Sequence, residues 1–92
     1  EIISQVSKYF QVDIEDLRGK SREQKYTTPR QIAMFILRED SKINLNSIGK
    51  LFGGRDHSTV LHAIRRVQTD ASTNPNLRRD LLSLRSSIIN RS

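Results

Sequence analysis

The stretch NLNSIGKLFGGRDHSTVLHAIRRV, which runs from Asn44 to Val67, decides the fold predicted for this chain. Each half has apolar residues at the spacing of a helix that buries one face. Gly53-Gly54 separate the halves, and Asp56 is a predicted N-cap because its carboxylate can accept from first-turn N–H groups. The apolar stripe of the second half is Val60, Ala63, Ile64 and Val67. Two helices joined by a glycine-containing turn are the outline of a helix-turn-helix.

In such a motif the second helix enters the DNA major groove, and its N-terminal residues meet base edges. The corresponding residues of this chain are all polar: Arg55, Asp56, His57, Ser58 and Thr59. The pattern therefore predicts a DNA-reading motif over residues 44–67, approximately.

Length and charge point to one small domain, residues 1–92, with a polyanionic partner. The net charge is +6. Residues 18–30 and residues 42–66 each carry five basic side chains and one acid, whereas residues 1–17 carry one lysine and four acids. This balance favours DNA, RNA or an acidic membrane surface as partner. The alternative is a basic domain that binds none of them.

Several function classes are disfavoured by what the sequence lacks. It has no cysteine, which excludes disulfides and thiolate metal sites and fits a reducing cytosol. No apolar run reaches the length of a membrane span, and no signal peptide opens the chain. Because the first residue is Glu1, we expect a piece of a longer protein.

The same spacing argument predicts helices on both sides of the motif. One covers Ile2 to Phe10, and a shorter one begins after Asp13, faces Ile14 and Leu17 inward and ends at Gly19. A last helix begins at Asn74-Pro75. Its predicted inner residues are Leu77, Leu81, Leu84 and Ile88.

Between the second helix and the motif, the sequence predicts a basic loop followed by a long helix. The loop covers about residues 18–28 and lacks apolar periodicity, so we expect a projecting, mobile arm. Thr28-Pro29-Arg30-Gln31 reads as a capping box with proline at the first helical position, which starts a helix running to about Asp40. The predicted fold is an all-α, compact six-helix domain containing a helix-turn-helix.

Catalytic and metal chemistry find little support. Asp56, His57 and Ser58 are the residue types of a hydrolase triad, but consecutive residues cannot converge on one another. His57 and His62 lie about 140° apart around a helix, which suits one metal poorly, and His62 is expected to pack or cap. There is no GxxxxGK[ST] phosphate loop. We predict no enzyme activity, no metal and no cofactor in these residues.

The segment IGKLFGGRDHSTVLHA, residues 48–63, closely resembles the signature of the C-terminal DNA-binding domain of the bacterial chromosomal replication initiator DnaA. TPRQIAMFILRE, residues 28–39, is similar to that domain's long helix, and KSR, residues 20–22, is similar to its basic loop. The similarity spans essentially all 92 residues. It implies a TrpR-like helix-turn-helix in this all-α domain. It also implies binding to the DnaA box, a short, non-palindromic, A/T-rich duplex element at the replication origin.

The resemblance also implies roles for individual residues. Asp56, His57, Ser58 and Thr59 would read bases in the major groove, and Arg22 would enter the minor groove. Phosphate contacts would come from Lys20, Lys25, Arg30, Gln31, Leu45, Asn46, Lys50 and Arg55. The family's loop is often richer in arginine, and Glu23 here should repel phosphate. We therefore expect weaker anchoring by the loop, with Arg22 retained.

For the longer protein, the resemblance implies an ATP-binding domain absent from this chain, contacts with further initiator copies through absent domains, and a bacterial cytoplasmic, nucleoid-associated location. Two other functions stay open. One is a helix-turn-helix transcription regulator that uses the same surface. The other is a protein-interaction module whose basic loop docks on an acidic partner.

Overall fold

The computed structural model describes residues 1–90 and contains six α-helices and no strand within them. In chain order they are α1 (Ile2–Phe10), α2 (Ile14–Arg18), α3 (Gln24–Glu39), α4 (Leu45–Leu51), α5 (His57–Ala71) and α6 (Pro75–Asn90). The predicted all-α, six-helix fold is confirmed. None of the helices in this described part is both long enough and apolar enough to cross a membrane.

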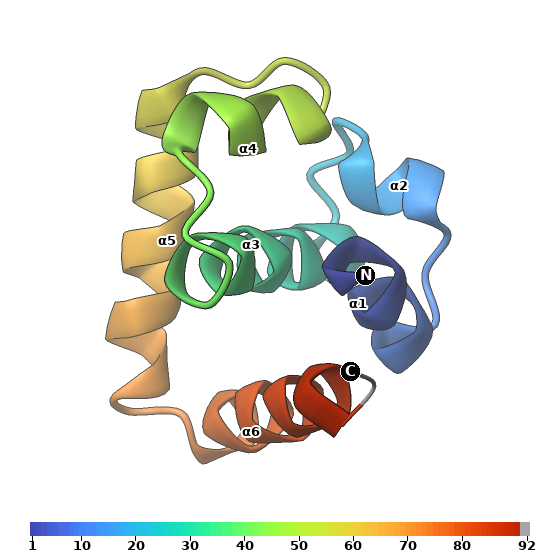
Figure 1. Cartoon of the computed structure of the whole chain (residues 1–92), viewed down its shortest axis with the longest axis vertical. Helices are drawn as coiled ribbons and strands as arrows, with labels where there is room; N and C mark the ends of the chain where they lie inside the picture. Colours follow the sequence, from blue (N-terminus) through green and yellow to red (C-terminus); the bar gives the residue numbers. More distant parts are fainter. Residues whose placement is uncertain (91–92) are drawn as a thin grey trace.

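Helix α3 forms the centre of the molecule, and the other helices pack around it (Figure 1). Six consecutive apolar residues of α3, from Ile32 to Leu37, are buried. Contacts on more than one side explain why this run is apolar all round rather than along one stripe. A rigid α3 holds both α2 and α5, so it fixes the helix-turn-helix relative to the N-terminal part of the chain.

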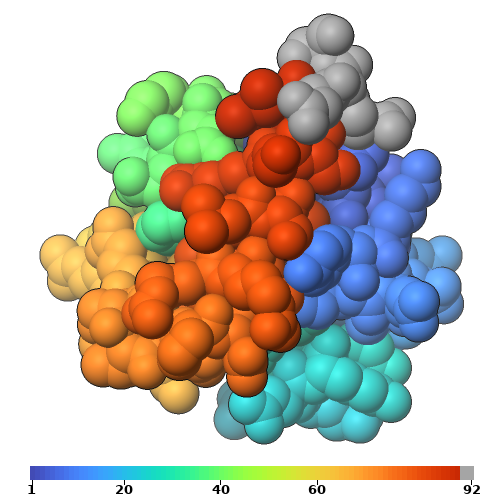
Figure 2. Space-filling view, turned by 90° about the horizontal axis from the view of Figure 1, so that it is seen from below, coloured from blue at the N-terminus to red at the C-terminus, as the bar shows by residue number. Residues whose placement is uncertain are grey.

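Helix α6 lies across the face of the molecule opposite α4, between α5 and α1 (Figures 1 and 2). Leu77, Leu81 and Leu84 are buried, as the sequence predicts, and Ile88 packs against the core at its edge. The Asn74 side chain caps the helix by accepting from the amide of Asn76 at 3.0 Å. This helix completes the core on the side away from α4, where it packs against α1 and α5.

The helix-turn-helix forms where the sequence predicts it. Asn44 caps α4 by accepting from the Ser47 amide at 2.9 Å, and Asp56 caps α5. Gly53 and Gly54 have φ angles of +80° and +81°, a left-handed conformation that favours glycine. The turn between the helices therefore depends on this glycine pair, as expected.

The predicted capping box at Thr28 is wrong, because α3 begins one turn earlier, at Gln24. The N-cap is Glu23, whose carbonyl accepts from the amides of Tyr26 and Thr27 at 2.9 and 3.0 Å. Pro29 then sits inside the helix near its start, where a missing N–H removes a single helical hydrogen bond. The sequence pattern identified the helix but placed its start too late.

Two further predictions about this region are wrong. The basic loop is shorter than residues 18–28, since only Gly19–Glu23 lie outside helices. Ile14 does not face inward but is 41% exposed. Because α2 has five residues, only its C-terminal turn reaches the core, with Leu17, while Ile14 lines a surface hollow beside Ser7 of α1.

Candidate nucleic-acid interface

The first turn of α5 presents polar side chains to solvent. Asp56, His57, Ser58 and Thr59 are all exposed. The Asp56 carboxylate accepts from the Thr59 amide at 2.8 Å through Oδ1. This hydrogen bond holds the pKa of Asp56 below its usual value, with smaller help from the Thr59 side chain. A carboxylate fixed in the ionised form can act as a hydrogen-bond acceptor toward a ligand.

The loop Gly19–Glu23 joins α2 to α3 and carries Arg22 and Lys20, both exposed. The Ser21 hydroxyl accepts from the Glu23 amide at 3.2 Å, which closes a local turn around Arg22. Glu23 also lies 3.8 Å from the Lys25 ammonium, and both side chains are about two-thirds exposed. An exposed pair of this kind contributes little to stability, but it partly neutralises Lys25.

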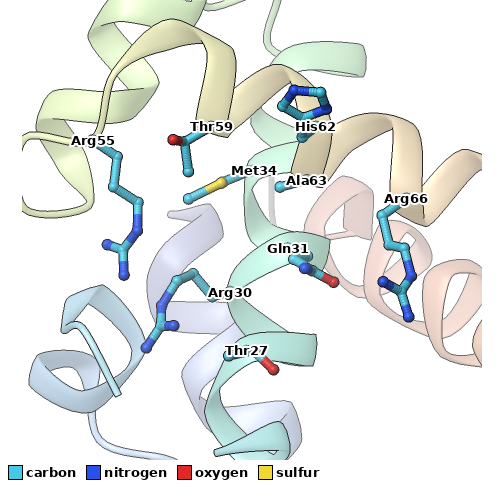
Figure 3. A pocket seen from close by; sticks show the side chains of 9 residues that line it. All are labelled: Thr27, Arg30, Gln31, Met34, Arg55, Thr59, His62, Ala63 and Arg66. Carbon is cyan, nitrogen blue, oxygen red and sulfur yellow. The ribbon is translucent and has the colours of Figure 1, made fainter. Parts of the chain in front are cut away.

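A cleft of about 520 Å³ runs between α3 and α5 (Figure 3). Its lining includes three arginines, a histidine and several hydroxyl or amide groups, with no acidic residue among them. The lining residues are Thr27, Arg30, Gln31, Met34, Arg55, Thr59, His62, Ala63 and Arg66. A concave surface of this composition attracts anions.

His62 and Arg66 belong to this surface, although neither is among the binding residues predicted from the sequence. His62 was expected to pack or cap, and that expectation is wrong because its side chain is exposed. Both follow Thr59 at i+3 and i+7, so they continue the face of α5 that begins with its polar first turn. Extending the helical spacing from Thr59 would have found them.

Arg30 occupies a position that does not support the phosphate contact predicted for it. Its side chain is 5% exposed, and its guanidinium donates to the carbonyls of Leu17 at 2.7 Å, Asp16 at 2.9 Å and Ser21 at 2.9 Å. Burial lowers its pKa, and the nearby charge of Arg55 lowers it further. Its donors hold α2 and the loop rather than facing solvent.

Arg55 is half-buried and is also engaged with the backbone. It donates to the carbonyls of Gly19 at 2.6 Å and Arg18 at 3.4 Å, and to that of Phe52. Desolvation lowers its pKa. A phosphate contact by Arg55, as predicted from the resemblance, would have to share a guanidinium that already bridges two segments of the chain.

The remaining predicted phosphate contacts lie at the surface. Lys50 and Asn46 of α4 are exposed, while Gln31 of α3 and Leu45 of α4 are half-buried. A hollow lined by Leu45, Asn46 and His57 places the start of α4 beside the start of α5. Among residues 1–90, no group of three or more His, Asp or Glu side chains is placed to hold a metal ion.

A helix-turn-helix with a polar first turn on its second helix, flanked by a cationic cleft and a basic loop, defines a DNA-binding domain of the helix-turn-helix class. The comparisons with known proteins agree. The model of the family described as "Bacterial dnaA protein helix-turn-helix" matches residues 1–67. The chain therefore belongs to the bacterial DnaA helix-turn-helix family, the DNA-binding domain of the replication initiator, and the predicted resemblance is confirmed.

Individual relatives show the same relationship. The chain is 41% identical over 91 residues to the chromosomal replication initiator protein DnaA of Lacticaseibacillus casei, covering 99% of this chain and 20% of that protein. For the same protein of Levilactobacillus brevis the identity is 44% over 84 residues, covering 91% and 19%. The chain thus spans about a fifth of the length of these curated relatives.

The fold also matches a solved structure, the crystal structure of a DNA replication initiation factor. The TM-score is 0.86 at 28% sequence identity, covering 98% of this chain and 27% of that chain.

Proposed function

We propose that this domain binds the DnaA box of a replication origin as a sequence-specific duplex DNA reader. The first turn of α5 enters the major groove, and Arg22 enters the adjacent minor groove. The observation that carries the proposal is the placement of four exposed polar side chains, residues 56–59, at the start of the second helix of a helix-turn-helix. Membership of the DnaA family supports this choice of target.

The base contacts follow from the chemistry of the groove edges. Ionised Asp56 accepts from a cytosine amino group, and His57 and the carbon atoms of Ser58 or Thr59 meet thymine. The Asp56 carboxylate serves both purposes, because its Oδ1 caps the helix while a carboxylate has two acceptor oxygens.

The minor-groove contact follows from charge and shape. Arg22 is exposed on a short loop whose ends are held by helices α2 and α3. A narrow A/T-rich minor groove has an enhanced negative potential that attracts guanidinium groups. Arg22 therefore adds a preference for A·T over G·C pairs. It does not distinguish A·T from T·A, because both present the same acceptors in the minor groove.

Phosphate contacts position the domain around these readers. We assign them to Lys20, Lys25, Gln31, Leu45, Asn46 and Lys50, with Arg55 contributing only where its backbone bonds leave a donor available. Because Glu23 lies beside Lys25, the loop contributes less than a loop without that acid would. A non-palindromic site is bound by one copy of the domain.

The rest of the initiator's activity belongs to other parts of the longer protein. We infer that ATP binding and contacts between initiator copies reside in the portion of the relatives, about four-fifths of their length, that this chain does not span. Under this proposal the 92-residue domain recognises the DNA site, and the other domains act on the DNA once it is bound.

Competition between a DnaA-box duplex and a scrambled duplex of the same composition tests the proposal. At one fixed salt concentration, a labelled box should be displaced by unlabelled box at a concentration at least about a hundredfold lower than by the scrambled duplex, because specific sites exceed non-specific ones by about 10³ or more. Equal competition by both duplexes would reject sequence-specific binding and favour a protein-interaction or general polyanion-binding role.

A further inference from the structure

Three arginines hold α2 and the loop that carries Arg22 against α3 and against the helix-turn-helix. Arg18, Arg30 and Arg55 come from α2, α3 and the turn before α5, and they are called here the arginine bracket. All three guanidinium groups donate to backbone carbonyl oxygens. Within residues 1–90, no ion pair joins any of them to a carboxylate.

Arg55 makes the most direct connection across the bracket. It immediately precedes Asp56, the N-cap of α5, and it donates to the Gly19 carbonyl at 2.6 Å. Gly19 lies three residues before Arg22. One side chain thus connects the start of α5 to the start of the loop, two segments 36 residues apart in the sequence.

Arg18 and Arg30 hold the same junction from other sides. Nε of Arg18 donates to the Leu51 carbonyl of α4 at 2.5 Å. Arg30 donates to the carbonyl of Ser21, the residue before Arg22, and to carbonyls of α2. In Figure 3 the guanidinium groups of Arg30 and Arg55 lie on the side of the cleft toward α2. The loop backbone is therefore held at its first residue, Gly19, and at its middle residue, Ser21.

Burying the arginine side chains of the bracket costs free energy, so they are a poor choice if their only role is to hold helices together. The guanidinium groups of Arg30 and Arg55 are neighbouring cations with no carboxylate partner within residues 1–90, and removing such a pair from water is costly. Here the negative partial charge comes from carbonyl oxygens at the C-terminal end of α2. Two apolar side chains could hold α2 against α3 without that cost, but they would not fix the direction of the loop backbone.

We propose that the arginine bracket sets the distance between Arg22 and the first turn of α5, so that one rigid domain meets two grooves at a fixed separation. This inference rests on the proposed function. Holding the loop in place before binding avoids the loss of conformational entropy that a free loop would suffer on the DNA. In this role Arg30 and Arg55 are positioning residues, and their contribution is expressed through Arg22.

A double-mutant cycle measures that dependence directly. Arg22→Ala should weaken binding to the DnaA box by about tenfold in the otherwise unchanged domain, but less than about twofold in an Arg55→Lys background. Lysine keeps the positive charge and loses the planar fork that bridges two carbonyls. His57→Ala should weaken binding by the same factor in both backgrounds, a result that a general loss of structure would not give.

A matched control and a second variant complete the test. Arg78→Lys alters an arginine that also donates to a backbone carbonyl, that of Ala71 at 2.7 Å, but lies on α6, so the cost of Arg22→Ala should stay at about tenfold there. If Arg55→Lys prevents folding, Arg18→Ala takes its place in the double-mutant cycle, because it removes an exposed hydrogen bond of the same bracket. The cost of Arg22→Ala should fall by at least about twofold in that background.

The outcomes separate the inference from the proposed function. No preference of the unchanged domain for the box would reject the proposed function itself. A clear preference for the box, combined with an equal cost of Arg22→Ala in every background, would overturn only the bracket. Box affinity of Arg55→Lys close to that of the unchanged domain would also overturn it, and would favour a plain phosphate contact that a lysine can replace.

Discussion

Asp56 has two roles that meet in one side chain, since it caps α5 and faces the proposed DNA surface. The Thr59 amide stabilises its ionised form, so its pKa in the folded domain lies below the unfolded value of about 3.9. The stability from the charged cap is therefore fully present above that unfolded value and is lost as the pH falls through the lower folded pKa.

This sign gives a test in the absence of DNA. Asp56→Asn keeps a capping oxygen but removes the charge, so the unchanged domain should melt at a higher temperature than the variant at pH 7. The gap should close as the pH falls below the unfolded pKa and through the lower folded pKa of Asp56. Asp13→Asn is the matched control, because Asp13 precedes α2 without a capping hydrogen bond from its side chain. A gap that does not change with pH would contradict this account of the cap.

His57 is the clearest candidate for a residue that reads bases. His57→Ala should weaken box binding by about 1–3 kcal/mol and change binding to scrambled duplex much less. His62→Ala is the control, since His62 is an exposed histidine of the same helix that lines the cleft and is not assigned a base. Equal losses on both duplexes for His57→Ala would remove His57 from the base-reading set.

Some of these residue roles could be predicted from the sequence, and others could not. The cap at Asp56 could be predicted because it depends on neighbours three residues away. The roles of Arg30 and Arg55 could not, because their partners at Leu17 and Gly19 lie 13 and 36 residues away in the chain. A basic residue near DNA-binding elements looks like a phosphate contact until its acceptors are known.

At the scale of elements, the helix-turn-helix depends on close packing as well as on its glycine turn. A Cβ atom built on Gly49 of α4 would lie 1.9 Å from the carbonyl oxygen of Arg55. That carbonyl belongs to the backbone directly before the N-cap of α5, so it cannot move without shifting α5. The positive φ angles of Gly53 and Gly54 complete the same connection.

Gly49→Ala should therefore destabilise the domain, although alanine favours helices by about 1 kcal/mol over glycine. Overpacking against fixed backbone costs about 1–3 kcal/mol or more, which exceeds that gain. Chemical denaturation measures the difference, with Lys50→Ala as the control at the next, exposed position of α4. A Gly49→Ala variant as stable as the unchanged domain would contradict this packing.

Helical spacing of apolar residues correctly predicted the six helices. It misplaced the start of α3, where the first turn of the helix has no apolar periodicity. The apolar stripe of α5 is buried as predicted, since one stripe facing one neighbour determines it. The start of α3 was misplaced because Thr28-Pro29 has the composition of a helix start, while the actual first turn, Gln24 to Thr27, has no apolar periodicity. Tertiary bonds from Arg30 fix the loop before that turn.

At the scale of the whole molecule, the net charge of +6 favours binding to a polyanion. Lys50 lies at the end of α4 and is exposed. Lys50→Ala should weaken binding to all duplexes alike, and the slope of log affinity against log salt should become shallower by about 0.9. Lys8→Ala, an exposed lysine of α1, should leave the slope unchanged. An unchanged slope for Lys50→Ala would remove Lys50 from the phosphate contacts.

Under the proposed function, one domain reads two grooves of the same duplex. Replacing A·T pairs of the DnaA box by I·C pairs, one position at a time, tests it directly, because I·C keeps the minor-groove pattern of A·T and presents that of G·C in the major groove. The measurement is affinity at fixed salt. Two adjoining blocks should appear: one where I·C weakens binding, and one where I·C is tolerated while G·C is not. Uniform behaviour across all A·T positions would contradict the two-groove account.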